Sequence, residues 1–518
     1  MASALTTGIG LTQGYCAEAS TPLQIRSMDD SVKAAPGSQN TDEATSTFDS
    51  NAAFGAKHTE TEHHTQKRPL HLKLPRRFLV MIAVLSTGWL DKGELQAGPR
   101  QGGPSGLADR QNSESLAAAG RACLRIVSWE VSSNQPAVHG VVYAEPKGTR
   151  LLGVSGVSAD NGRTWSPVRF QPDLQDSLPY GYRREPVSSV CDRRTGRLIT
   201  ILNALDTPGL DPSANEPAIA QNTYYLRYRV SNDGGRSWLF DEPIVQTGAY
   251  GPKHPVAGVW VGTNSIYLGD AGCIPIVTHK GNVLVPTQMP PLAPDGSLWN
   301  PGGGYTFTDV LVLIGTWSKT GHLRWEASQR VRGDPICTTR GLIEPTICEF
   351  PDGRILMVMR GSNGGKADPN HELASRKWVS VSSDGGRTWS AAGPWTHDDG
   401  QPFFSPSSMS TLFSHSSGRF FWVGNISPNN CKGNLPRWPL VMAEVDPRSL
   451  YLIRQTSLVV DSEQPADRLQ GRLDISHVTL WEDSQTREIV LTYPRAHHAY
   501  ESYDWVTARL ALNPKGRP

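Results

Sequence analysis

Short hydrophobic segments recur along residues 120–515, and each of them follows a turn of glycine or charged residues. Successive segments start 47, 85, 72, 65 and 69 residues apart. A self-similar spacing is typical of repeat folds, and each unit has room for a four-stranded sheet of short strands. The pattern therefore predicts an all-β protein of six units, with strands that begin at Leu151, Leu198, Val283, Ile355, Phe420 and Ile489.

A second pattern, S-x-D-x-G-x-[ST]-W, occurs three times, at Ser158–Trp165, Ser231–Trp238 and Ser382–Trp389. The Ser, Asp and Thr side chains can bond the backbone of a tight turn, while glycine supplies a positive φ. The Trp leaves the turn to be buried in the next strand. A decayed copy, Ser318–Trp325, keeps the Ser and the Trp but lacks the Asp. Each copy predicts a stapled β-hairpin.

This motif resembles the Asp-box of the sialidase (neuraminidase) superfamily, in which it marks BNR repeats. Together with the six units, the resemblance implies a six-bladed β-propeller over residues 120–515. The first unit is short, which predicts a blade completed by strands from both chain ends, with residues 122–127 and 506–512 as candidates. A β-sandwich is the alternative, but a sandwich does not account for repeated Asp-boxes.

The N-terminal part has a different composition. Residues 1–69 are polar, and we expect them to be disordered or to reflect a start assigned too early. Residues 70–97 combine a basic flank, an apolar stretch over 78–90 and a small residue at Ala97, as a secretory signal does. The apolar stretch is short for a span of about 20 residues. We expect a secreted or periplasmic protein, with a retained envelope anchor at 78–90 as the alternative.

The charge balance and the spacing of cysteine and histidine residues argue against several classes of ligand. The chain has 50 basic and 49 acidic residues, a formal net charge of +1, which argues against binding nucleic acid or a membrane surface by bulk electrostatics. Its seven cysteines and its histidine pairs lack the spacing of metal ligands. We therefore expect no metal and no cofactor, and the resemblance implies a glycan or glycoconjugate as the substrate.

Sialidases use a glutamate and an arginine at one end of a hairpin, and residues 341–360 resemble that arrangement. Glu344 opens the first strand, Arg360 ends the second, and a turn at Asp352 separates them. Arg360 follows five apolar residues, where a charge is costly unless it is paired or solvated. The resemblance implies that Glu344 is a catalytic base and that Arg360 binds a substrate carboxylate, although an ordinary hairpin with surface charge has the same pattern.

Two further arginines complete the three-arginine clamp that the resemblance implies. Arg184 lies in register with the R-x-P motif of sialidases, with Arg183 as a near rival. Arg437, beside Trp438, precedes a strand of the fifth unit. A planar guanidinium is the natural bidentate partner of a carboxylate. A basic turn and a surface loop are the plain alternatives for Arg184 and Arg437, respectively.

Three aspartates are candidates for the acid/base residue and for a further contact with the substrate. Asp206 and Asp211 lie in the loop that matches the acid/base loop of sialidases, and Asp206 is slightly preferred. Asp270 lies in a glycine-rich segment that resembles the lining of the substrate site. All three are also common turn residues.

The sequence differs from sialidases at the position of the nucleophile, because Ile475 occupies the place at which sialidases have a tyrosine. Tyr493, at the end of the next strand, is the substitute candidate, although no motif supports it. The resulting hypothesis is an exported exo-glycosidase that removes terminal acidic sugars, with sialic acid as the first guess. A non-catalytic carbohydrate-binding propeller and a protein-interaction propeller are the alternatives.

Overall fold

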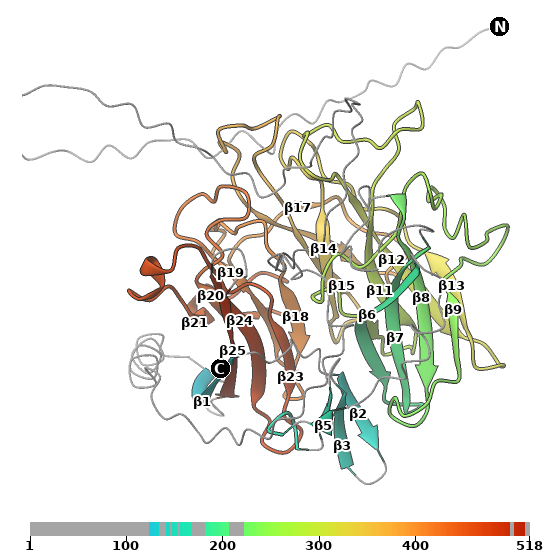
Figure 1. Ribbon diagram of the computed structural model, residues 1–518, viewed down its shortest axis with the longest axis horizontal. Coiled ribbons are helices and arrows are strands. Elements are labelled where there is room, and N and C mark those ends of the chain that lie inside the picture. Colours follow the sequence, from blue (N-terminus) through green and yellow to red (C-terminus); the bar gives the residue numbers. More distant parts are fainter. Residues whose placement is uncertain are drawn as a thin grey trace, which may run out of the picture. The chain divides into compact units, whose positions relative to one another are not determined.

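The computed structural model describes residues 124–133, 141–145, 148–152, 156–158, 160–164, 166–167, 182–206, 222–497 and 502–512. These residues form an all-β propeller, with two three-residue 3-10 turns, η2 (Arg454–Thr456) and η3 (Asp467–Leu469) (Figure 1). All of them belong to one compact unit, Leu74–Pro518. The predicted N-terminal segment 1–69 and the signal-like segment 70–97 lie outside the described residues. Within the described part, no helix is long and apolar enough to cross a membrane.

Five sheets have four antiparallel strands each, in sequence order. The first two sheets contain β2 (Val141–Glu145), β3 (Gly148–Leu152), β4 (Gly156–Ser158), β5 (Ser166–Pro167), and then β6 (Tyr182–Asp192), β7 (Arg197–Asp206), β8 (Tyr225–Ser231), β9 (Phe240–Pro243). The next two contain β10 (Ile276–Val277), β11 (Val283–Met289), β12 (Asp309–Trp317), β13 (Leu323–Ala327), and then β14 (Ile343–Glu349), β15 (Ile355–Arg360), β16 (Lys377–Ser382), β17 (Gly393–Pro394). The fifth contains β18 (Thr411–Ser414), β19 (Phe420–Asn425), β20 (Leu440–Val445), β21 (Leu458–Asp461).

The remaining sheet differs from these five blades because it has five strands and uses both ends of the described chain. Its strands are β1 (Leu124–Ser133), β22 (Leu473–Asp474), β23 (Thr479–Glu482), β24 (Ile489–His497) and β25 (Ser502–Leu512). In Figure 1, the cyan strand β1 lies beside the dark red strand β25, with which it pairs antiparallel. We call this sheet the closing sheet.

The six predicted strands are confirmed as β3, β7, β11, β15, β19 and β24, one in each sheet, although β3 begins at Gly148 and not at the predicted Leu151. The prediction of a six-bladed propeller is corrected to five regular four-stranded blades and the closing sheet. The structure also corrects which unit the chain ends complete. It is the last unit and not the first, because β25 follows β24 directly and offers its free edge to β1.

Hydrophobic side chains fill the spaces between neighbouring sheets. One core cluster joins the sheet of β6–β9 to that of β10–β13, and another joins the latter to the sheet of β14–β17. Two more clusters join the sheet of β18–β21 to its neighbours on either side. Strands such as β7 and β11 are buried on both faces, as this radial packing requires.

The Asp-box prediction is confirmed at atomic detail. In the first copy, Ser158 Oγ donates to Asp160 Oδ1 at 2.7 Å and accepts from the Gly162 amide at 2.7 Å. The second and third copies repeat these bonds at 2.7–2.9 Å. The predicted burial holds for Trp389, whereas Trp238 is only half-buried and stacks under Arg229.

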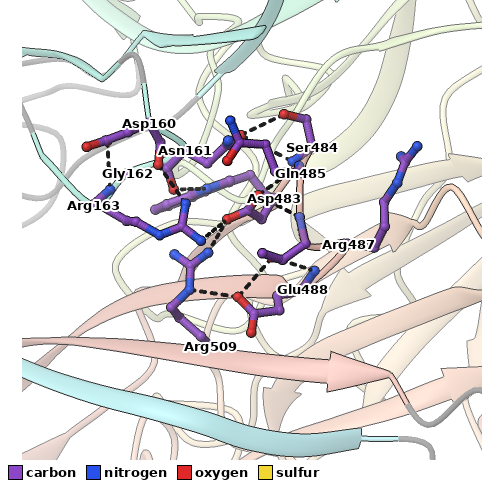
Figure 2. Close-up of polar contacts among 12 residues, drawn as sticks. Asp160, Asn161, Gly162, Arg163, Asp483, Ser484, Gln485, Arg487, Glu488 and Arg509 are labelled. Carbon is purple, nitrogen blue, oxygen red and sulfur yellow. Dashed lines mark hydrogen bonds and ion pairs between the residues drawn. The ribbon is translucent and has the colours of Figure 1, made fainter.

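The first Asp-box also joins the first blade to the closing sheet (Figure 2). Arg163 Nη2 lies 2.8 Å from Asp483 Oδ2, and Arg509 donates to the same carboxylate. The Asn161 carboxamide accepts hydrogen bonds from the backbone and the side chain of Ser484 at 3.2 and 3.0 Å. A local turn motif therefore also serves as a long-range contact.

Candidate functional site

The hairpin of β14 and β15 brings Glu344 and Arg360 together. Ile343 pairs with Arg360 in the strand register, so the start of one strand meets the end of the next. Arg360 Nη1 lies 2.5 Å from Glu344 Oε1, and each side chain is only 5% exposed. Arg360 also donates from Nε to Ser407 Oγ at 2.7 Å and from Nη2 to Asn434 Oδ1 at 3.1 Å. The predicted charge in an apolar strand is thus paired and buried.

The surroundings of Glu344 hold it in one orientation. Its φ is +49°, a left-handed conformation that is uncommon for a residue with a side chain. The Gln288 side chain accepts a hydrogen bond from the Glu344 amide at 2.8 Å. A Cβ on Gly269 would lie 2.8 Å from Glu344 Cγ, so glycine is required there. Glu344 Oε2 is buried and has no hydrogen-bond partner among the described residues, which leaves it able to accept a proton or a bond from a ligand.

Arg437 lies next to this pair. Its Nη1 is 2.8 Å from Asp474 Oδ2, and its Nη2 donates to the Ser407 carbonyl at 3.3 Å. Arg360 binds the hydroxyl of the same serine, so Ser407 brings the two guanidinium groups together. The Ile475 amide donates to the Arg437 carbonyl at 3.2 Å, which ties the Arg437 segment to β22. Two of the three predicted arginines therefore converge.

Asp270 reaches the same cluster from the segment before β10. Asn203 positions this segment, because its side chain exchanges two 2.9 Å hydrogen bonds with the backbone of Leu268. Burial, followed by the negative charge of Glu344, raises the pKa of Asp270 to about 8, although Arg360 and Arg437 oppose this shift. The cluster thus contains a carboxyl group that keeps its proton at neutral pH beside a carboxylate that is paired with an arginine.

Two further cations in the cluster were not predicted from the sequence. Burial lowers the pKa of Lys377 to about 7, with the positive charge of Arg360 as the next cause, and its Nζ donates to the Ser408 carbonyl. The same two causes lower the pKa of Arg340 to about 10. Lys377 pairs directly with Arg360 in the register of β15 and β16. Aligning these two strands in the sequence would therefore have placed Lys377 in the cluster. Arg340 lies four residues before Glu344 in the sequence.

The third predicted arginine, Arg184, pairs with Asp206, one of the predicted acid/base candidates. Arg184 Nη1 lies 2.6 Å from Asp206 Oδ1, and Tyr225 donates to Asp206 Oδ2 at 2.8 Å. Burial raises the pKa of Tyr225 to about 12, with the Arg184 charge opposing the shift and the Asp206 hydrogen bond adding to it. Arg184 Nη1 also donates to the Leu205 carbonyl at 3.3 Å. Asp211, the other acid/base candidate, lies outside the described residues.

The position of Tyr493 does not support the role of nucleophile. Its side chain is fully buried in the core cluster that also contains Ile475. Burial and the charge of Asp461 raise its pKa well above the ordinary value, so the anionic form is disfavoured. Tyr493 is the middle residue of β24, a strand that is buried on both faces, so its side chain lies in the core. Instead, Asp474 and His477, which flank Ile475, reach the cluster.

Sequence comparison agrees with the fold. Residues 212–464 match the model of the BNR repeat-like domain. The match supports the recognition of a sialidase-like BNR, or Asp-box, propeller in this chain. No curated protein sequence matches the chain.

The solved structures that are similar to this chain have low sequence identity to it. A protein of unknown function from Dyadobacter fermentans is 14% identical, with a TM-score of 0.48, over 75% of this chain and 99% of that one. A Hadza microbial sialidase is 17% identical, with a TM-score of 0.43, over 70% of this chain and 59% of its own length. The GH93 α-L-arabinofuranosidase of Fusarium graminearum is 12% identical, with a TM-score of 0.40, over 75% of this chain and 98% of that one.

Proposed function

We propose that this protein is an exo-acting glycoside hydrolase for glycans that end in an acidic sugar, with sialic acid as the first substrate to test. One observation carries the proposal. The carboxyl groups of Glu344, which is ion-paired with Arg360, and of Asp270, whose pKa is raised to about 8, lie in one buried cluster with Arg360 and Arg437. Paired carboxyl groups whose surroundings separate their protonation states are typical of glycosidases.

In the proposed reaction, Asp270 is the acid and Glu344 is the base. The Asp270 proton moves to the glycosidic oxygen, whose bond to the anomeric carbon breaks with the electron pair going to oxygen. A water molecule attacks the anomeric carbon and gives a proton to Glu344. The Oε2 atom of Glu344, which is unpaired in the described structure, is the acceptor for that proton. Arg360 holds Oε1 and keeps the carboxylate oriented.

The charge of the cluster favours an anionic substrate. At neutral pH, with Asp270 protonated, the cluster holds the guanidinium groups of Arg340, Arg360 and Arg437 and only two further carboxyl groups, Glu344 and Asp474, which pair with Arg360 and Arg437. A substrate carboxylate would therefore be attracted, and arginine is the residue best suited to bind it in a bidentate manner.

A second candidate is a propeller that binds an acidic glycan without cleaving it. The observation that favours it is the burial of Ile475, because the position at which sialidases have a nucleophilic tyrosine belongs to the core here. A glycan-binding propeller would use the same cationic cluster to hold the acidic sugar, but it would not break the glycosidic bond.

The test is hydrolysis of a fluorogenic α-sialoside by the full chain, with Glu344→Gln and Asp270→Asn as the informative variants. Glu326→Gln is the matched control, since Glu326 is 58% exposed on β13 and forms only a 3.5 Å pair with Arg387. We expect turnover in the wild type and in the control, and its loss in both informative variants. Sialoside binding without turnover in the wild type would contradict the enzyme and support the glycan-binding candidate.

We also propose that the protein is exported from the cell that makes it. If residues 70–97 are a secretory signal, the mature protein begins after about residue 97 and is secreted or periplasmic. Sequencing the N-terminus of the protein recovered from its producing cells tests this point. A chain that keeps the apolar stretch at 78–90 would instead support the envelope anchor.

A further inference from the structure

A buried histidine joins two carboxyl groups that come from distant parts of the chain. His477 Nε2 lies 3.5 Å from Asp270 Oδ2, and its Nδ1 lies 3.8 Å from Asp474 Oδ1. Asp270 precedes β10, whereas Asp474 and His477 lie at and just after β22. His477 therefore lies between the two carboxyl groups, and the reaction proposed above gives a chemical role only to Asp270.

The neighbours of His477 indicate how its ring is oriented. Ser476 Oγ donates to Asp474 Oδ1 at 2.7 Å and lies 3.4 Å from His477 Nδ1. Because the serine hydroxyl has given its own hydrogen to Asp474, its lone pairs face Nδ1 and favour a hydrogen there. The lone pair of a neutral imidazole then lies on Nε2, the atom that faces Asp270.

Asp474 itself is fixed as a carboxylate. Arg437 binds its Oδ2 at 2.8 Å, and Arg472 lies 3.4 Å from the same atom. Its Oδ1 accepts hydrogen bonds from the amide and the hydroxyl of Ser476. These contacts stabilise the charged form of Asp474. The proton that can move among the three side chains is therefore the one between Asp270 and His477.

We propose that His477 is a positioning residue that accepts the hydrogen bond of the protonated Asp270 carboxyl and thereby holds the proton for transfer to the glycosidic oxygen. This role rests on the proposed hydrolase function, in which Asp270 is the acid. A neutral imidazole beside the carboxyl favours its protonated form, and the same contact fixes which way the O–H points.

The protonation of the two groups agrees with this arrangement. Burial lowers the pKa of His477 to about 4, so the ring is neutral where Asp270, with a pKa of about 8, keeps its proton. The other charged or titratable groups that act on this pair are Cys273, Glu344, Arg360, Arg437 and Asp474. Arg360 and Arg437 oppose a charge on the ring, whereas Asp474 and Glu344 favour it.

The test compares His477→Phe, which keeps a ring but has no lone pair, with His477→Gln, which can offer an amide oxygen. The readout is the carbonyl stretch of the protonated carboxylic acid in the infrared spectrum of the full chain, titrated from about pH 5 to about pH 10. Loss of the band in Asp270→Asn assigns it to Asp270. We expect the midpoint to fall by roughly one pH unit in His477→Phe and to stay nearer to the wild-type value in His477→Gln.

The same variants are then assayed on the sialoside, where the basic limb of the pH profile of kcat should move with the infrared midpoint. An unchanged midpoint in His477→Phe would overturn the role of His477. If the infrared midpoint shifts in His477→Phe but the wild type hydrolyses no sialoside, the hydrogen bond between His477 and Asp270 is supported and the hydrolase function is overturned. If His477→Phe does not fold, an infrared midpoint in His477→Gln that equals the wild-type value supports the role, and a fall of a full unit contradicts it.

Discussion

Arg360 Nη1 and Glu344 Oε1 lie 2.5 Å apart, and both side chains are 5% exposed, so this ion pair is internal to the protein. Arg360, for which the resemblance implies a role in binding the substrate, is therefore also a structural partner of the proposed base. Removing either member leaves the other as a buried charge without its partner, and the cost of that exceeds the value of the pair itself.

Replacing Arg360 with alanine should lower both stability and activity. We expect the free energy of unfolding to fall by about 3–5 kcal/mol, because Glu344 loses its buried partner. Urea denaturation measures the loss. The control Arg387→Ala, which removes an arginine that is 50% exposed, should cost less than about 1 kcal/mol. Equal stability of the two variants would contradict the buried pair.

Replacing Asp270 with asparagine should stabilise the protein increasingly as the pH rises. The folded pKa is raised from 3.8 to about 8, so the folded state holds a proton that the unfolded chain has already lost in this range. Asp270 therefore lowers stability progressively from about pH 4 to about pH 8. We expect Asp270→Asn to exceed the wild type by about 2–5 kcal/mol at pH 8 and by little at pH 4.

The measurement is a series of urea titrations across that range. His477 and Lys377 have lowered folded pKa values and act with the opposite sign, but they are present in both proteins. Their contributions therefore largely cancel in the difference. A stability difference that is constant with pH would show that Asp270 titrates normally.

Replacing Gly162 with alanine should weaken the closure of the propeller. Gly162 has a φ of +85°, and a Cβ there would lie 2.5 Å from the Trp481 ring in the closing sheet. Gly196→Ala is the matched control, since its φ is +69° and nothing lies within 4 Å of the added atom. Both variants suffer the backbone penalty, and Gly162→Ala should cost about 1–3 kcal/mol more because of the clash. Thermal unfolding compares them, and equal losses would argue against the contact with Trp481.

Replacing Asp384 with alanine should destabilise the third Asp-box. Its carboxylate accepts hydrogen bonds from the Arg387 and Thr388 amides and from the Thr388 hydroxyl, at 2.6–3.1 Å. We expect a loss of about 1–3 kcal/mol in urea denaturation, and a smaller loss for Thr388→Val, which removes one bond. These bonds outweigh desolvation and lower the pKa of Asp384 to about 2, so the contribution is present above about pH 4 and is lost as the pH falls through 2. A stability difference that persists unchanged below that pH would contradict the assignment.

Local patterns in the sequence predicted the strands, the Asp-box turns and one side-chain pair. The Asp-box is determined within eight residues, because its serine and aspartate bond the backbone of their own turn. Glu344 and Arg360 were predictable for a related reason. They are 16 residues apart on one hairpin, and strand register brings the start of β14 to the end of β15.

Tertiary structure alone decided which distant groups meet and which faces are buried. Asp270 and His477 are about 200 residues apart in the sequence, and only the tertiary structure brings their side chains to 3.5 Å from each other. Tyr493 entered the core because propeller strands are packed on both faces, so alternation along β24 does not reveal which side is open. Turn chemistry and hairpin register act over a few residues and can be read along the chain, whereas contacts between sheets depend on how the whole propeller closes.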